Sequence, residues 1–295
     1  MGNNATEIRT KRNPKVINRD GIKYIAAVPM IIGHAVGYFV ENGILENNTL
    51  TMILTSLALF APPIFFFSIA DGYKYTSSRK KYALRLLLFA AASQIPFAIL
   101  NCGTIFTLDA LLNLNVFFTL LAGLLAIVLW ESKLNLVLRI VGVVLIDGIT
   151  YALCCEWMIF GVPIILALHI FENKPKIRFI CFAVCIAAIE FITYGMTIDA
   201  FITPSFIAGT LSLLAGYFFR TVFYSGKKGK HPVFSKWFFY IVYPAHLALI
   251  YILVLLLKAK DLQRAAAFAA VFFCFLQVIR KNSIFIRKDL TFVDV

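Results

Sequence analysis

Residues 22–40 read IKYIAAVPMIIGHAVGYFV, and only Lys23 and His34 interrupt this apolar run. About 20 apolar residues in a helix cross the hydrocarbon core of a bilayer. A backbone in lipid must satisfy its own hydrogen bonds, so a run of this length forms a helix. It is too long and too continuously apolar to be a strand of a membrane barrel. The run therefore predicts a transmembrane helix.

The composition of the whole chain extends this prediction beyond one segment. Of its 295 residues, 61% are apolar, and the mean hydropathy is +0.85. Only 15% are charged, against about 25% in soluble proteins. Too few polar residues remain to surround a domain in water. The composition thus excludes a soluble protein.

Charge clusters and Gly, Pro and Asn residues divide the chain into ten apolar runs. They span 22–40, 50–70, 82–100, 116–130, 137–153, 157–171, 178–196, 204–223, 237–257 and 265–279. We expect an all-α, polytopic helical bundle with about ten transmembrane helices. Residues 22–279 would form its membrane domain, between basic tails at 1–21 and 280–295.

The distribution of basic residues predicts the orientation of the bundle. The net charge is +13. If both termini are cytoplasmic, 25 of the 28 basic residues fall in the tails and inner loops, as the positive-inside rule requires. The outer loops then carry the acidic residues Glu41, Glu46, Asp109, Glu156 and Asp199. Orientation in the membrane accounts for the basic excess, and no nucleic-acid motif accompanies it, so we expect no nucleic-acid partner.

The sequence lacks two signatures that would point to other functions. Its six cysteines are scattered, without CxxC or Cys/His spacing, so we expect no metal. It also shows no internal repeat, direct or inverted. Many secondary transporters are built from such repeats.

His34 is the most informative polar residue inside a predicted span. An ionisable side chain within the bilayer is costly and marks a functional site by default. Lys23 lies eleven residues earlier, close to three helical turns and about 16 Å away, so both residues project from one face. Such a face can line a cavity in which His34 acts as a general base. The alternatives are a histidine satisfied by a neighbouring helix and a lysine that reaches the interface as an anchor.

A second histidine lies in KWFFYIVYPAHLALIY at residues 236–251. Tyr243 precedes His246 by three residues, so the two share a helix face. Pro244 permits a kink between them. This pattern suits a lined cavity, and aromatic packing near the inner leaflet is the alternative.

The segment Asp71–Arg85, DGYKYTSSRKKYALR, is denser in positive charge than orientation alone requires. Its cations are Lys74, Arg79, Lys80, Lys81 and Arg85. Arg pairs bidentately with phosphates and Lys acts as a point charge. The segment therefore predicts either a polyanion pocket at the cytoplasmic mouth of the bundle or an ordinary inner loop.

Five blocks of sequence together resemble the TraX family. They are DGIKYIAAVPMIIGH at residues 20–34, FFFSIADGYKYTSSRKKYALRLL at 65–87, SQIPF at 93–97, LNVFFTLLAGLLA at 114–126 and FYIVYPAHL at 239–247. TraX proteins are membrane proteins associated with acetylation of the amino terminus of conjugative pilin. The family is similar to the acyltransferase-3 group, in which a basic residue precedes an essential histidine of the first helix by eleven positions. Lys23 and His34 match that spacing, with Lys in place of the usual Arg.

The resemblance implies a protein of the bacterial cytoplasmic (inner) membrane that uses acetyl-CoA as acyl donor. The CoA phosphates would lie near Lys23 and the basic segment, with Lys74, Arg79, Lys80, Lys81 and Arg85 as candidate ligands. The thioester would reach toward His34. The acceptor would be a protein such as pilin or a surface glycan or lipid.

The chemistry of acyl transfer assigns roles that agree with this implication. A thioester needs a base to activate an amine or hydroxyl acceptor, or a nucleophile that first takes the acyl group. His34 can fill either role, with Lys23, Tyr243 and His246 as further catalytic candidates. Tyr243, Gln94 and Asn115 are candidate donors to the oxyanion.

Three functions stay open at this point. The first is a membrane acetyltransferase that modifies an acceptor in or across the bilayer. The second is a secondary transporter of a small anionic solute, which ten helices and a few buried polar groups would also serve. The third is a membrane scaffold for an assembly apparatus, which would tolerate the loss of His34.

Overall fold

A computed structural model describes residues 15–193, 195, 198–229 and 232–258. Within these residues the protein is all-helical and has no strand, only an isolated bridge between Ile17 and Tyr224. The predicted helical fold class is confirmed. The predicted tail at 280–295 and the predicted span at 265–279 lie outside the described residues.

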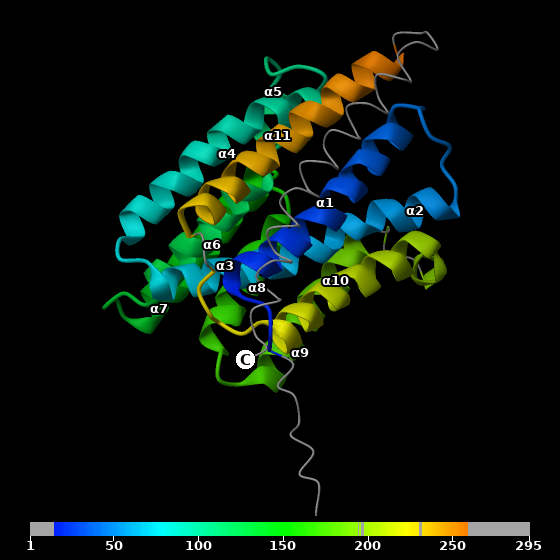
Figure 1. The fold of residues 1–295 in the computed structure, drawn as a ribbon. Coiled ribbons are helices and arrows are strands. Elements are labelled where there is room, and N and C mark those ends of the chain that lie inside the picture. Colours follow the sequence, from blue (N-terminus) through cyan, green and yellow to red (C-terminus); the bar gives the residue numbers. More distant parts are fainter. Residues whose placement is uncertain (1–14, 194, 196–197, 230–231, 259–295) are drawn as a thin grey trace, which may run out of the picture.

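Eleven α-helices and two 3₁₀ segments follow one another through the described residues (Figure 1). They are α1 (Arg19–Glu41), α2 (Thr49–Ser56), η1 (Leu57–Phe60), α3 (Ala61–Tyr75), α4 (Arg79–Cys102), α5 (Leu108–Leu112), α6 (Val116–Trp130), α7 (Leu136–Ala152), α8 (Met158–Ile170), α9 (Pro175–Thr193), η2 (Ile198–Ile202), α10 (Pro204–Phe223) and α11 (Pro232–Lys258).

Six helical segments of the described residues are long and apolar enough to cross a membrane. They are Arg19–Glu41, Thr49–Tyr75, Arg79–Cys102, Leu108–Trp130, Pro204–Phe223 and Trp237–Lys258. The predicted runs at 137–153, 157–171 and 178–196 also form helices, as α7, α8 and α9, but they do not meet the same length and hydropathy criteria. Ten spans and cytoplasmic termini therefore stay predictions.

The second candidate span contains a 3₁₀ turn, which lies against α1. Pro62 and Pro63 follow the turn at the start of α3, where a missing N–H costs no helical hydrogen bond. α1 approaches the turn closely at Gly33, where a Cβ would collide with the backbone of Thr55 and Ala58. A glycine directly before His34 thus permits the close packing of α1 that positions the histidine.

α1, α4 and α11 lie near one another along one side of the bundle, and α11 packs against both α4 and α1 (Figure 1). α6 and α8 pack together, and α6 also contacts α3 and α4. Their contacts form a core that includes the fully buried Phe66, Leu124, Ile127 and Ile164. This packing brings α1, α3, α4, α6, α10 and α11 around one cavity.

Candidate functional site

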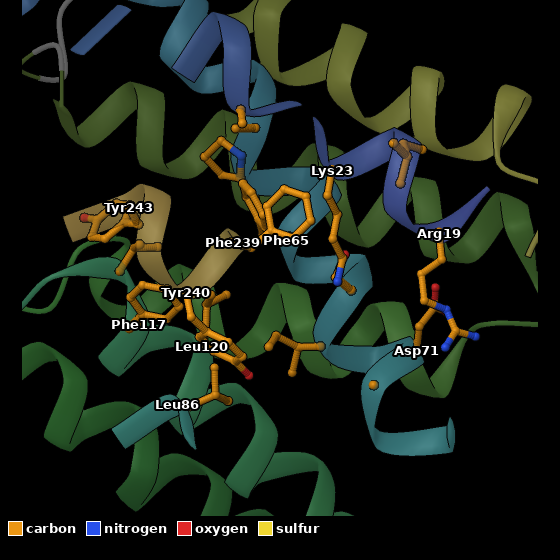
Figure 2. A pocket seen from close by; sticks show the side chains of 18 of the residues that line it. Arg19, Lys23, Phe65, Asp71, Leu86, Phe117, Leu120, Phe239, Tyr240 and Tyr243 are labelled. Atoms are coloured by element: carbon orange, nitrogen blue, oxygen red, sulfur yellow. The ribbon is translucent and has the colours of Figure 1, made fainter. Parts of the chain in front are cut away.

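A cavity of about 490 Å³ extends along the inner face of α1. His34 lies at one part of its wall, and Arg19, fifteen positions earlier on the same helix, lies at another. A helix rises about 1.5 Å per residue, so the two residues are about 22 Å apart. Figure 2 shows Tyr243 on one side, Arg19 and Asp71 on the other, and Phe65, Phe239 and Tyr240 between them. We call the region around His34 and Tyr243 the histidine end and the region around Arg19 and Asp71 the basic end.

The histidine end contains a hydrogen-bonded pair of histidines from α1 and α11. Nδ1 of His34 lies 2.9 Å from Nε2 of His246, and the two rings are stacked with 5.2 Å between their centroids. Nδ1 of His246 lies 2.9 Å from the carbonyl oxygen of Val242. The sequence singled out both histidines, and the tertiary structure brings them together across 212 positions of the chain.

The hydrogen bonds of this pair determine which nitrogens carry protons. A carbonyl oxygen only accepts, so Nδ1 of His246 must donate to Val242. In the neutral ring, Nε2 of His246 is then an acceptor, and Nδ1 of His34 must donate to it. This leaves a lone pair on Nε2 of His34. His34 lines the cavity, whereas His246 is 3% exposed and lies behind it.

Glu156 is a further titratable residue at this end. Its Oε2 accepts hydrogen bonds from the backbone N–H of Val116 (2.6 Å) and from the hydroxyl of Tyr243 (3.0 Å). Val116 is the first residue of α6, where the helix dipole favours a negative charge. Burial raises the pKa of Glu156, and the two hydrogen bonds partly lower it. Glu156 and Tyr243 both line the cavity.

A strained loop presents Glu156 to the cavity. Cys154, Trp157 and Met158 all have positive φ angles, of 42°, 70° and 27°. Non-glycine residues rarely adopt such angles, which persist only where the surrounding structure enforces them. Here the Glu156 N–H donates to the carbonyl of Leu114, and the Thr150 hydroxyl donates to the carbonyl of Met158.

Gln94 and Asn115 join α4 to the start of α6. Gln94 Nε2 donates to the carbonyls of Ala110 (3.1 Å) and Asn113 (2.6 Å). Asn115 Nδ2 donates to the carbonyl of Ala90 (2.8 Å) and to Oε1 of Gln94 (2.9 Å). Both N–H bonds of each amide are thus used within the protein, and neither residue is part of the cavity wall. Tyr243, the third candidate donor to the oxyanion, likewise donates its hydroxyl proton within the protein, to Glu156.

The basic end collects cations from four parts of the chain. They are Arg19 and Lys23 on α1, Arg85 on α4, Arg220 on α10, and Lys228 after α10, and all line the cavity. Two backbone hydrogen bonds hold the start of α1 beside the end of α10 and the chain after it: Ile17 N–H donates to the carbonyl of Phe223, and Arg19 N–H donates to the carbonyl of Lys227. Nε of Arg19 and of Arg85 is buried and has no hydrogen-bond partner among the described residues.

An ion pair holds Arg220 in the wall of the basic end. Arg220 Nη2 lies 2.5 Å from Oδ2 of Asp71, and its guanidinium lies 3.3 Å from the ring centroid of Tyr224. Arg220 is 8% exposed. Asp71 belongs to the basic segment singled out in the sequence. Its partner Arg220 is 149 positions away, so no local pattern indicates the pair.

The structure separates the cations that the resemblance had grouped. Lys23 and Arg85 are in the cavity wall, and Lys23 also lies 5.5 Å from the ring centroid of Phe239. The remaining candidates are not: Lys74 pairs with Glu172 at 2.5 Å and Arg79 stacks on Tyr73, while Lys80 and Lys81 are exposed on the first turn of α4.

Sequence reasoning missed Glu156, Arg19, Arg220 and Lys228. Glu156 counted only as an acidic residue of a predicted outer loop, and the three cations counted only toward orientation. No signal within a single helix indicates that they meet His34, Lys23 and Arg85 around one cavity.

Comparison with known proteins names a family. The chain is 28% identical over 238 residues to the probable fimbrial assembly protein FimC, serogroup H1, of Dichelobacter nodosus, covering 78% of this chain and 92% of the relative. No solved structure matches. The family model described as TraX protein matches residues 18–254, which include every residue of both ends of the cavity. The chain belongs to the TraX family.

Proposed function

We propose that this protein is an integral membrane acetyltransferase that moves an acetyl group from acetyl-CoA to an amine or hydroxyl acceptor. The observation that carries the proposal is the cavity itself, because it joins a histidine with a free Nε2 lone pair to a group of cations, of which Lys23 lies about 16 Å and Arg19 about 22 Å along the same helix. Acyl transfer from CoA needs both features, a proton acceptor at the thioester and positive charge at the phosphates.

The basic end fits the phosphates of the donor. Arg19, Arg85 and Arg220 supply guanidinium groups that match phosphate geometry, and Lys23 and Lys228 add point charges. Apolar and aromatic residues, among them Phe65 and Phe239, line the passage toward His34. An extended pantetheine arm would lie along this passage with its thioester at the histidine end. We place the basic end toward the cytoplasm, where acetyl-CoA is made.

His34 carries the proton transfer in this mechanism. As a base, its Nε2 takes the proton of the acceptor N–H or O–H while the acceptor attacks the thioester carbon. The C–S bond then breaks, and His34 returns the proton to the CoA thiolate. As a nucleophile, Nε2 would instead take the acetyl group first and pass it to the acceptor. In both versions His246 holds the His34 ring in the reactive tautomer.

A pilus subunit is the acceptor that the family context favours. The relative from Dichelobacter nodosus is named for fimbrial assembly. A protein acceptor would offer an amine or a hydroxyl group to the histidine end. A surface glycan or lipid would offer a hydroxyl group there. Mass spectrometry of pilins and surface polymers from cells with and without the gene distinguishes these acceptors.

Ligand binding and turnover of the purified protein test the proposal. We expect acetyl-CoA to raise the melting temperature, because a ligand at 100 times its Kd adds about 2.7 kcal/mol of stability. The protein should also release CoA thiol from acetyl-CoA, and His34→Ala should abolish this release while keeping the thermal shift. His169→Ala is the matched control, since His169 pairs with Glu131 outside the cavity wall. If acetyl-CoA causes no thermal shift and no CoA thiol is released, the transporter or scaffold function is favoured instead.

A further inference from the structure

Glu156 occupies an unusual position for a carboxylate. It lines the same cavity end as His34, and both of its hydrogen bonds reach a single oxygen, Oε2. Both are donated to the carboxylate, by an N–H group and by a phenol hydroxyl. Oε1 has no hydrogen-bond partner within the described residues. One side of the carboxylate is thus anchored at the start of α6, while the other is directed to no protein group.

The anchor of Glu156 leads directly to the histidine pair. Tyr243 donates to Glu156 and also contacts the ring of His246, with 5.4 Å between the ring centroids. His246 then bonds His34. Tyr243 and His246 flank Pro244, whose missing N–H leaves α11 without one helical hydrogen bond at this point. The Glu156–Tyr243 bond therefore holds α11 beside the point where one of its helical hydrogen bonds is missing.

Two features that hold Glu156 in this place lower the stability of the folded protein. Three non-glycine residues around it have positive φ angles, each of which costs on the order of 1 kcal/mol or more. Burial of the carboxylate adds a further penalty, which is why its pKa is raised. Strain and buried charge of this kind concentrate at functional sites.

We infer that Glu156 is a positioning residue for the proposed acetyl transfer: it fixes His246 through Tyr243 and balances the positive charge that forms on His34. When His34 takes the acceptor proton, its ring becomes an imidazolium in a largely apolar cavity. A carboxylate at the same end offsets this charge, and an apolar cavity screens their attraction less than water does. The inference rests on the proposed function.

The other titratable groups at this end cannot supply that charge. Tyr38 on α1 donates to Asn101, and Tyr243 on α11 donates to Glu156 itself. Cys155 lies beside Glu156 in the loop, where burial raises the pKa of its thiol to about 11. Glu41, seven positions after His34 on α1, is exposed, and His246 is a partner of His34. Glu156 is thus the group at this end that is suited to carry a negative charge.

Replacement of Glu156 by Gln tests the inference in the full-length protein. Gln keeps the shape and can still accept from Tyr243 and Val116, but it has no charge. We expect Glu156→Gln to bind acetyl-CoA normally and to release CoA thiol at least about 100-fold more slowly, the usual scale of a charge or acid–base contribution. Water, a short peptide amine and a hexose serve as acceptor probes. Glu131→Gln, at an exposed position, is the matched control.

Two further measurements separate an active role from simple scaffolding. Without the carboxylate, His34 should lose its proton more readily, so the acid limb of the pH–rate profile of Glu156→Gln should move to lower pH. Tyr243→Phe keeps the carboxylate and removes only its link to α11, so its rate should fall while its acid limb stays near the wild-type position. Glu156→Asp should recover part of the rate.

The results of these measurements distinguish failure of the inference from failure of the proposed function. A wild-type rate and pH profile for Glu156→Gln would overturn the inference and leave the acetyltransferase proposal intact. Absence of thiol release by the wild-type protein would overturn both. If Glu156→Gln fails to fold, the Tyr243→Phe variant decides: an unchanged rate there refutes the link to His246.

Discussion

The two ends of the cavity differ in how their polar groups are satisfied. At the histidine end, Val242, His246 and His34 form one continuous set of hydrogen bonds, and Tyr243 and Glu156 form another at the start of α6. At the basic end, cations from several segments converge: Arg220 pairs with Asp71, whereas Nε of Arg19 and of Arg85 has no partner within the described residues.

This difference follows from what each end has to do in the proposed reaction. Proton transfer requires groups held within hydrogen-bond distance, so a preorganised network favours it. Binding of phosphates instead requires donors that the protein has not already used. The histidine end is thus organised for proton transfer, and the basic end is organised for binding phosphates. This difference predicts that variants at the two ends affect different kinetic constants.

The largest expected effect is at the histidine pair. His34→Gln should lower kcat at least about 100-fold, because Gln cannot take a proton. His246→Gln should lose less, because its amide oxygen can still accept from Nδ1 of His34 and keep the reactive tautomer. Rates of CoA thiol release with saturating acetyl-CoA measure both. Equal losses in the two variants would contradict the tautomer assigned to His34.

The next effect concerns the ion pair at the basic end. Arg220→Ala leaves the Asp71 carboxylate without its 2.5 Å partner and should destabilise the protein by about 3 kcal/mol, as for other buried pairs. Thermal unfolding measures this loss. Replacing both partners, Asp71→Asn with Arg220→Leu, should restore much of the stability but not the affinity for acetyl-CoA. If the double variant binds acetyl-CoA as tightly as the wild type, Arg220 has no part in binding.

A smaller effect distinguishes two arginines that are close in sequence. Arg85 lines the cavity, whereas Arg79 stacks on Tyr73 away from it. Arg85→Ala should raise the KM for acetyl-CoA about tenfold, or about 1.4 kcal/mol, with less change in kcat. Arg79→Ala should change neither constant. An equal rise in KM for both variants would show that phosphates bind outside the cavity as well.

The last prediction concerns orientation and involves no change in rate. Cys154 is exposed in the loop before Glu156, and Cys155 beside it is buried. If the basic end faces the cytoplasm, this loop faces outward, and Cys154 should react in intact cells with a membrane-impermeant maleimide under reducing conditions. Cys154→Ser should lose most of this labelling. Labelling that appears only after the membrane is opened would reverse the orientation.

The class of fold and two of the main residues could be predicted from the amino-acid sequence. Long apolar runs predict helices because lipid leaves a backbone no other way to satisfy its hydrogen bonds. A titratable residue such as His34 within such a run is conspicuous because it is costly there. The spacing of Lys23 and His34 follows from helical geometry, and both residues do line one cavity.

Which polar groups meet could not be predicted in this way, because it depends on how the helices pack. His34 and His246 are 212 positions apart, Asp71 and Arg220 are 149 apart, and Glu156 and Tyr243 are 87 apart. Helical periodicity relates residues within a few turns, whereas the packing of α1, α4, α10 and α11 depends on the shapes of whole helix surfaces. The proposed role of Glu156 depends most on that packing, because Tyr243 and His246 come from α11 and His34 comes from α1, all far along the chain from the loop of Glu156.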